Sequence, residues 1–328
     1  SVMTIAKAWA EKGFVTKEFI TYLEDESSIS FPWSMIDKIT PRPDASVKKM
    51  LEDAGFTDTE SIVTSKNTYV APFVNAEEAQ YLVIENAFPN GRPALENAGV
   101  MFTSRETVEK VERMKVCTCL NPLHTALAVY GCLLGYTKIS DEMKDADLVK
   151  LVEIIGYKEG LPVVTDPGIL SPKKFIDEVL QIRVPNPFMP DTPQRIACDT
   201  SQKLSIRFGE TIKEYMASSE LDVKSLKFIP MVQAGWCRYL LGVDDELNAF
   251  TVSPDPMYEE LAGKLAGVKV GESCDVHAVL SPILSDAKIF GVNLYEAGLG
   301  EYVESIFAEL IAGKGAVRET LKRHLAEA

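Results

Sequence analysis

One short stretch of the chain combines residue types that handle protons and hydrogen bonds. Lys115, Asn121 and His124 stand within the segment KVCTCLNPLH. A lysine whose pKa is lowered by desolvation takes a proton from an alcohol, and an amide donates to the oxygen as negative charge develops on it. A histidine orients a hydroxyl group. The set therefore suits proton abstraction from an alcohol; the alternative interpretation is an asparagine cap, a structural histidine and a surface lysine.

The local sequence predicts how these side chains are positioned. Asn121 followed by Pro122 is typical of a helix start, with asparagine at the N-cap and proline at the first helical position. His124 would then lie in the first turn, where the partial positive charge of the helix end disfavours imidazolium. We therefore expect a neutral ring that forms hydrogen bonds and lies beside the Asn121 side chain.

The spacing between the lysine and the histidine sets a condition. His124 stands nine positions after Lys115, which is about 180° around an uninterrupted α-helix. The two side chains would then lie on opposite faces. Either a bulge or a helix that starts afresh at Asn121 must intervene. If neither is present, Lys115 is not the base.

Four motifs stand in order along the chain. The stretch around Lys115 is similar to a KxxxxNxxH signature. Residues 30–41, SFPWSMIDKITP, resemble SFPNSMVDRITP, and residues 84–93, IENAFPNGRP, resemble EDxFxxGRP. Residues 195–203, RIACDTSQK, are similar to a substrate segment with an arginine and a lysine separated by seven residues. Together they resemble the polyol-specific long-chain dehydrogenases, a family that includes mannitol 2-dehydrogenase, fructuronate reductase and tagaturonate reductase, and the resemblance spans essentially the whole chain.

The resemblance implies roles for individual residues. Lys115 would be the general base in oxidation and the acid in reduction, Asn121 an oxyanion donor, and His124 a substrate-orienting group. The substrate-binding residues would be Asp37, Arg195 and Lys203. Glu112 would assist proton exchange. The cofactor would be NAD(H), with NADP(H) not excluded, and no metal is expected.

The chain departs from the family pattern at two places. Five residues separate Lys115 from Asn121 instead of four, and Trp33 replaces a small polar asparagine. Other interpretations also remain for the binding residues. Asp37 could cap backbone amides in a turn bounded by prolines. Arg195 and Lys203 would lie about 80° apart on one helix, which an ordinary solvated helix face also explains.

Composition excludes several classes of partner. The 328 residues have a net charge of −14 and no basic cluster, so nucleic acid is not expected. No apolar run reaches the roughly 18 residues of a membrane span. The six cysteines form no CxxC pair, which favours a reduced cytoplasmic protein without a zinc site.

The order of elements predicts an α+β beginning followed by a mostly α-helical domain. Strands are expected around 62–64, 80–85 and 100–103, and helices within 1–24 and over 44–54. Helical patterns then cover 107–118, 122–136, 140–155, 172–183, 192–217, 224–242, 255–264, 275–287 and 301–325. No glycine-rich phosphate signature is complete. The resemblance implies that residues 1–106 are the C-terminal portion of a dinucleotide-binding α/β domain, so the chain is expected to begin partway through a fold. Residues 107–328 would form the helical substrate-binding and catalytic domain.

The resemblance implies an NAD(P)-dependent oxidoreductase that interconverts a secondary alcohol and a ketone in a polyol or sugar acid. The insertion between Asp37 and Gln80 and the NPLH variant resemble the fructuronate reductase (D-mannonate oxidoreductase) branch of the family more closely than the mannitol dehydrogenases. The alternatives are mannitol 2-dehydrogenase and tagaturonate reductase. A different class also fits the five-residue spacer, namely an inactive helical binding module.

Overall fold

The computed structural model describes residues 2–40, 43–78 and 80–328, which fall into two compact units. The first comprises the described residues within 1–38 and 78–112, and the second those within 39–77 and 113–328. The predicted domain division between 106 and 107 stays a prediction.

The first unit pairs a helical hairpin with a small mixed sheet. Its helices are α1 (Val2–Glu11) and α2 (Lys17–Glu24), separated by Gly13 in the left-handed region. The sheet has the order β1 (Ser34–Asp37), β4 (Tyr81–Glu85) and β5 (Met101–Thr103). β1 runs antiparallel to β4, whereas β5 runs parallel to it. The short turn η1 (Leu95–Ala98) precedes β5, and α4 (Arg105–Met114) follows it.

The second unit begins with a small appendage. It consists of α3 (Ala45–Asp53) and the hairpin of β2 (Ile62–Val63) with β3 (Tyr69–Val70). Glu77 follows it and forms a buried ion pair with Arg183, with Oε1 and Nη2 2.7 Å apart. This pair joins the end of the appendage to the helical part of the same unit.

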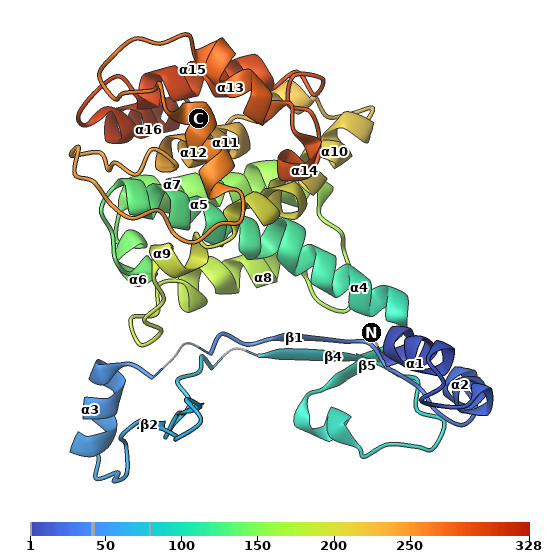
Figure 1. Ribbon diagram of the computed structural model, residues 1–328. Helices are drawn as coiled ribbons and strands as arrows, with labels where there is room; N and C mark the ends of the chain where they lie inside the picture. Colours follow the sequence, from blue (N-terminus) through green and yellow to red (C-terminus); the bar gives the residue numbers. More distant parts are fainter. Residues whose placement is uncertain (1, 41–42, 79) are drawn as a thin grey trace. The chain divides into compact units, whose positions relative to one another are not determined.

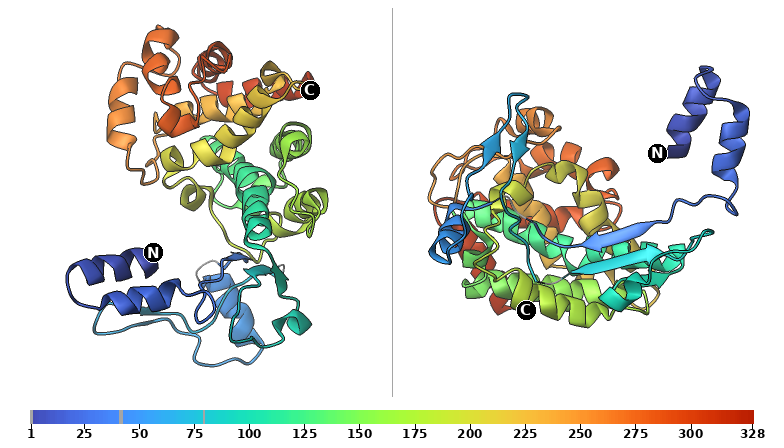
Figure 2. Two further views of the ribbon diagram at one scale, coloured as in Figure 1. Left: turned by 90° about the vertical axis from the view of Figure 1, so that its right-hand side faces the viewer. Right: turned by 90° about the horizontal axis from the view of Figure 1, so that it is seen from below.

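The remainder of the second unit is helical (Figures 1 and 2). α5 (Asn121–Leu133) is buried along almost its whole length and packs against α7, α9 and α11. The α-helices after α5 are α6 (Ile139–Glu142), α7 (Ala146–Glu153), α8 (Pro172–Glu178), α9 (Pro193–Ile196), α10 (Glu210–Ala217), α11 (Phe228–Tyr239), α12 (Tyr258–Leu265), α13 (Val276–Leu284), α14 (Ala287–Phe290), α15 (Gly300–Leu310) and α16 (Ala316–Ala326). The core lies between α5, α11 and α15, around side chains such as Trp236 and Tyr130.

Several short turns connect these helices. Four of them are π-helical: η2 (Lys115–Cys119), η3 (Ile154–Gly160), η5 (Val179–Arg183) and η7 (Ser205–Gly209). Three are 3₁₀ turns: η4 (Leu161–Val163), η6 (Thr200–Gln202) and η8 (Val223–Ser225). π-Helical turns are rare and concentrate at functional sites, and η2 and η7 both pack against α5.

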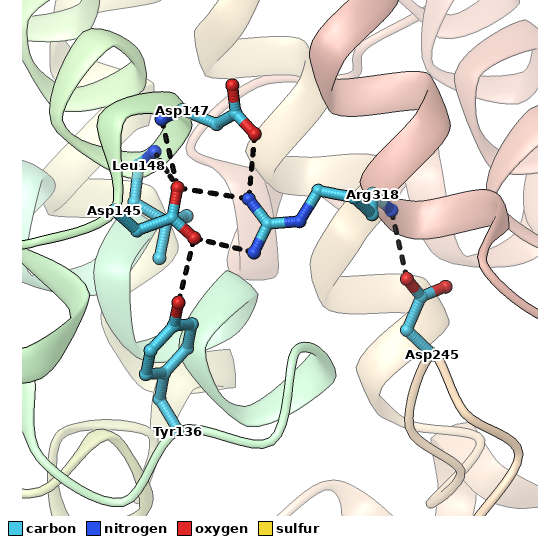
Figure 3. Close-up of polar contacts among 6 residues, drawn as sticks. All are labelled: Tyr136, Asp145, Asp147, Leu148, Asp245 and Arg318. Carbon is cyan, nitrogen blue, oxygen red and sulfur yellow. Dashed lines mark hydrogen bonds and ion pairs between the residues drawn. The ribbon is translucent and has the colours of Figure 1, made fainter.

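A polar network connects the last helix, α16, to other elements of the second unit (Figure 3). Arg318 of α16 donates to both carboxylate oxygens of Asp145, which precedes α7, and to Asp147. Tyr136 donates to Asp145 at 2.8 Å. Asp245 accepts the backbone N–H groups of Val317 and Arg318, which caps the start of α16. The carboxylates therefore hold both the side chain and the backbone of Arg318.

Candidate active site around Lys115, Asn121 and His124

The helix changes its winding between Lys115 and Asn121. Residues Lys115–Cys119 form a π-helical turn, in which the N–H of Leu120 donates to the carbonyl of Lys115 at 3.1 Å. Leu120 then leaves helical geometry with φ −130° and ψ −61°, and α5 starts at Asn121. The spacing requires either a bulge or a fresh helix start, and both are present. A π-turn absorbs one residue, so Lys115 and His124 are separated by roughly 80° instead of about 180°.

The start of α5 differs by one position from the prediction. Leu120 occupies the N-cap, and Asn121 is already helical, because the π-turn ends on Leu120. The predicted cap by the Asn121 side chain is therefore wrong. In the part of the chain that the structure describes, neither the Asn121 amide nor the His124 ring has a hydrogen-bonding partner. Both side chains are partly buried, as is that of Lys115. The amide thus stays available to an external oxygen atom.

His124 lies in an electropositive environment. Burial lowers the pKa of its ring to about 4, an effect opposed by Asp191 and reinforced by Arg207, Arg195 and Arg183. The ring is therefore neutral at physiological pH, as the sequence predicted, although burial and nearby cations are the main causes. A neutral imidazole both donates and accepts a hydrogen bond, which suits contact with a hydroxyl group.

The two predicted substrate cations lie in broken helical structure. Residues 192–217 do not form one helix: α9 ends at Ile196, and η6 and η7 precede α10. The expectation of one helix face shared by Arg195 and Lys203 is therefore wrong. Asp199 adopts a left-handed φ of 51° at the break, and its N–H donates to the carbonyl of Pro254.

Arg195 and Lys203 already have partners within the second unit. Arg195 binds both carboxylate oxygens of the buried Asp191, with Nε 2.6 Å from Oδ1. Its side chain is 61% exposed. The ammonium of Lys203 donates to the carbonyl of Cys198. Burial lowers the pKa of Lys203, and Arg207 lowers it further.

Arg207 was missed at the sequence level. It lies in η7, and its Nη1 donates to Thr125 Oγ1 at 2.6 Å. The hydroxyl of Thr125 in turn donates to the carbonyl of Asn121 at 2.8 Å. The position of Arg207 four residues after Lys203 is the one sequence signal that could have indicated a second cation at this place.

The remaining predicted residues, Asp37 and Glu112, belong to the first unit. Asp37 ends β1 opposite Tyr81 and is buried, whereas Glu112 is exposed on α4. A cavity of about 870 Å³ in the first unit is lined by residues that include Trp33, Glu85 and Arg105. Arg105 pairs with Glu85, and its guanidinium lies 5.0 Å from the centre of the Trp33 ring. Lys115, Asn121 and His124 are not among the residues that line this cavity.

Comparison with known proteins decides the family. Residues 107–306 match the mannitol dehydrogenase C-terminal domain. The chain belongs to this family. It is 59% identical over 326 residues to a D-mannonate oxidoreductase of Thermotoga maritima. The match covers 98% of this chain and 60% of that protein. A mannitol dehydrogenase of Saccharomyces cerevisiae is 30% identical over 85% of the chain and 52% of its own length.

A solved structure agrees with this assignment. The Pseudomonas fluorescens mannitol 2-dehydrogenase, in a ternary complex with NAD and D-mannitol, superposes with a TM-score of 0.71 at 26% identity. The superposition covers 95% of this chain and 57% of that one. This mannitol dehydrogenase family chain therefore spans about half to three fifths of the length of the relatives it matches.

Metal binding and membrane insertion depend on two further features of the described residues. Among the described residues, no group of three or more histidine, cysteine or acidic side chains could hold a metal ion. One helical stretch of the described chain, Arg105–Leu133, is long and apolar enough to cross a membrane by length and composition. However, 83% of its most apolar window is buried inside the protein, as in the core helix of a globular domain.

Proposed function

We propose that this chain forms the substrate-binding part of an NAD(P)-dependent D-mannonate oxidoreductase, that is, a fructuronate reductase. The observation that supports it best is the π-turn before Asn121, which brings Lys115 towards the face of His124. The 59% identity to a D-mannonate oxidoreductase supports the choice of substrate. Mannitol 2-dehydrogenase and tagaturonate reductase are the alternatives within the family.

In the proposed mechanism, this chain handles the proton of the reacting alcohol. Lys115 takes the hydroxyl proton in oxidation and returns it in reduction. The Asn121 amide donates to the oxygen as negative charge develops there. His124, neutral because its pKa is lowered to about 4, orients the reacting hydroxyl group. Asp37, Arg195 and Lys203 would bind the rest of the substrate, and Glu112 would assist proton exchange with solvent.

The proposed cofactor is NAD(H), with NADP(H) as the alternative, and it would exchange a hydride with the carbon atom. The sequence has no complete glycine-rich phosphate loop, and the sheet that the described residues form has three strands. These residues do not fit a whole dinucleotide, so we assign them only proton handling and substrate binding. We propose residues 1–106 as part of the dinucleotide-binding domain and 107–328 as the substrate-binding domain.

The setting of the enzyme is also part of the proposal. The substrate is a small sugar acid or polyol, and neither nucleic acid nor a membrane is proposed as a partner. All six cysteines are free thiols, which supports a reducing compartment such as the cytoplasm.

The test is NADH oxidation with fructuronate, tagaturonate and fructose. The enzyme would combine this chain with the part of its Thermotoga maritima relative that the chain does not match. We expect turnover with fructuronate above the other two substrates. Faster turnover of fructose would favour mannitol 2-dehydrogenase, and faster turnover of tagaturonate would favour tagaturonate reductase. No turnover with any of the three would favour the inactive binding module.

A further inference from the structure

Arg207 is a cation beside the candidate active site, and no carboxylate among the described residues forms an ion pair with it. Its turn, η7, packs against both η2 and α5, the elements that carry Lys115, Asn121 and His124. Among the described residues, no aspartate or glutamate lies within ion-pair distance of its guanidinium. Arg183 and Arg195 differ in this respect, because Glu77 and Asp191 bind them.

The guanidinium of Arg207 is fixed but retains donors. Its Nη1 donates to Thr125 Oγ1 at 2.6 Å, and Thr125 donates to the Asn121 carbonyl at 2.8 Å. This chain of hydrogen bonds ties Arg207 to the first turn of α5. An arginine has five N–H donors, and no other side-chain hydrogen bond of Arg207 is present in the described structure. The remaining donors can form a fork for an anion.

The local charge favours an anionic ligand. Burial lowers the pKa of Arg207 to about 10, and no neighbouring acid opposes this effect. Lys203 lies four residues earlier, its carbonyl accepts the N–H of Arg207 at 2.9 Å, and its pKa is also lowered by burial and by Arg207. Two partly buried cations therefore stand together in a chain whose net charge is −14. Such cations are unfavourable unless a counter-ion joins them.

We propose that Arg207 binds the carboxylate of the sugar-acid substrate and thereby selects the acid over a neutral polyol or ketose. Lys203 contributes a second positive charge to the same carboxylate. A carboxylate accepts two parallel hydrogen bonds from a guanidinium, whereas a terminal hydroxymethyl group offers one oxygen and no charge. This inference rests on the proposed function and adds the residue that distinguishes sugar acids from polyols.

The test compares an acidic and a neutral substrate in the enzyme described above. Arg207→Gln should raise the KM for fructuronate by about 10- to 100-fold, the range of a lost charge-assisted hydrogen bond. It should leave the KM for fructose unchanged, and kcat for fructuronate should change little. Arg207→Lys keeps the charge and should recover part of the affinity for fructuronate.

Arg323→Gln provides the matched control, because it removes an arginine that pairs with Glu309 on the surface. An equal rise of both KM values in Arg207→Gln would assign Arg207 to holding Thr125 in place and would overturn the inference. Unchanged KM values would also overturn it, while leaving the proposed function intact. Absence of turnover in the unmodified enzyme would overturn both. Melting temperatures of the variants show whether either substitution affects folding.

Discussion

The N–H of Leu120 donates to the carbonyl of Lys115 at 3.1 Å, five residues back along the chain instead of four. This single wide turn reconciles the five-residue spacer with a site that needs Lys115 and His124 on neighbouring faces. π-Turns of this kind behave as one-residue insertions in an α-helix. The extra residue is therefore absorbed in the backbone before α5 begins at Asn121.

The first prediction concerns Lys115. Lys115→Ala should lower kcat for fructuronate reduction by about 100- to 10,000-fold, the usual contribution of a general acid or base. The melting temperature should change little, because the side chain is partly exposed. Lys264→Ala is the control, since Lys264 pairs with Glu260 on the surface of α12. Retention of the full rate by Lys115→Ala would contradict the proposed mechanism.

The second prediction concerns the protonation of His124. Its pKa is lowered from 6.5 to about 4, mainly by burial, so the unfolded chain binds the proton more readily than the folded one. The contribution of the neutral His124 ring to the free energy of unfolding is complete above pH 6.5 and is lost as the pH falls towards 4. Across this window, the free energy of unfolding of the parent should therefore fall by about 1–3 kcal/mol more than that of His124→Gln. Urea unfolding at several pH values measures this difference.

An NMR titration of the His124 ring gives the direct check. The other two histidines, His277 and His324, form contacts with Glu304 and Glu309 and serve as internal references. A His124 midpoint near 6.5 would contradict a neutral ring held by burial and neighbouring cations.

Local sequence signals predicted much of the fold. The strand patterns at 62–64, 80–85 and 100–103 correspond to β2, β4 and β5, and the pattern at 172–183 corresponds to α8 with η5. β1 was missed because prolines flank this four-residue strand and its pairing with β4 is non-local. The predicted helix over 301–325 is divided between α15 and α16 at Gly313 and Gly315, both at positive φ.

The site was predictable only in part. The motif around Lys115 required a break in the helix, and the structure contains it. By contrast, the break at Asp199 depends on a hydrogen bond to Pro254, 55 residues further along the chain. The lack of a counter-ion for Arg207 among the described residues is likewise a three-dimensional property. No local pattern shows which acid an arginine lacks, so the carboxylate site proposed at Arg207 could not be located from sequence.

The third prediction concerns the packing of η7 against the backbone at Phe290. A Cβ at Gly209 would lie 2.2 Å from the carbonyl oxygen of Phe290, which is backbone and cannot move aside cheaply. Gly209→Ala should therefore destabilise the protein by about 1–3 kcal/mol and weaken fructuronate binding through Arg207. Gly263→Ala is the matched control, because a Cβ there meets nothing within 4 Å. In the helix α12 it should stabilise by up to about 1 kcal/mol. Similar unfolding midpoints for the two variants would contradict this account.

The fourth prediction concerns the network of Figure 3. Burial alone would raise the pKa of Asp145, but hydrogen bonds from Arg318 and Tyr136 hold it below its usual value. Arg318→Gln should destabilise the protein by about 1–3 kcal/mol at pH 7. This loss should shrink as the pH falls below about 4, since a carboxylate with a lowered pKa stabilises only while it is ionised. Unfolding free energies of Arg318→Gln and of Arg323→Gln, an exposed site on the same helix, measure the difference across pH.

The last prediction concerns Glu142, a fully buried glutamate whose two carboxylate oxygens have no hydrogen-bonding partner in the described structure. Burial, with Asp145 and Asp191 nearby, raises its pKa from 4.5 to about 9. The folded protein therefore keeps the carboxyl group of Glu142 neutral. Its contribution to the free energy of unfolding is full below pH 4.5 and is lost as the pH rises towards 9. Because Glu142→Gln is neutral at every pH, its free energy of unfolding should rise relative to that of the parent by about 1 kcal/mol per pH unit between pH 5 and 8. The exposed Glu259→Gln is the control, and a constant difference between Glu142→Gln and the parent across this range would show that Glu142 is ionised in the folded protein.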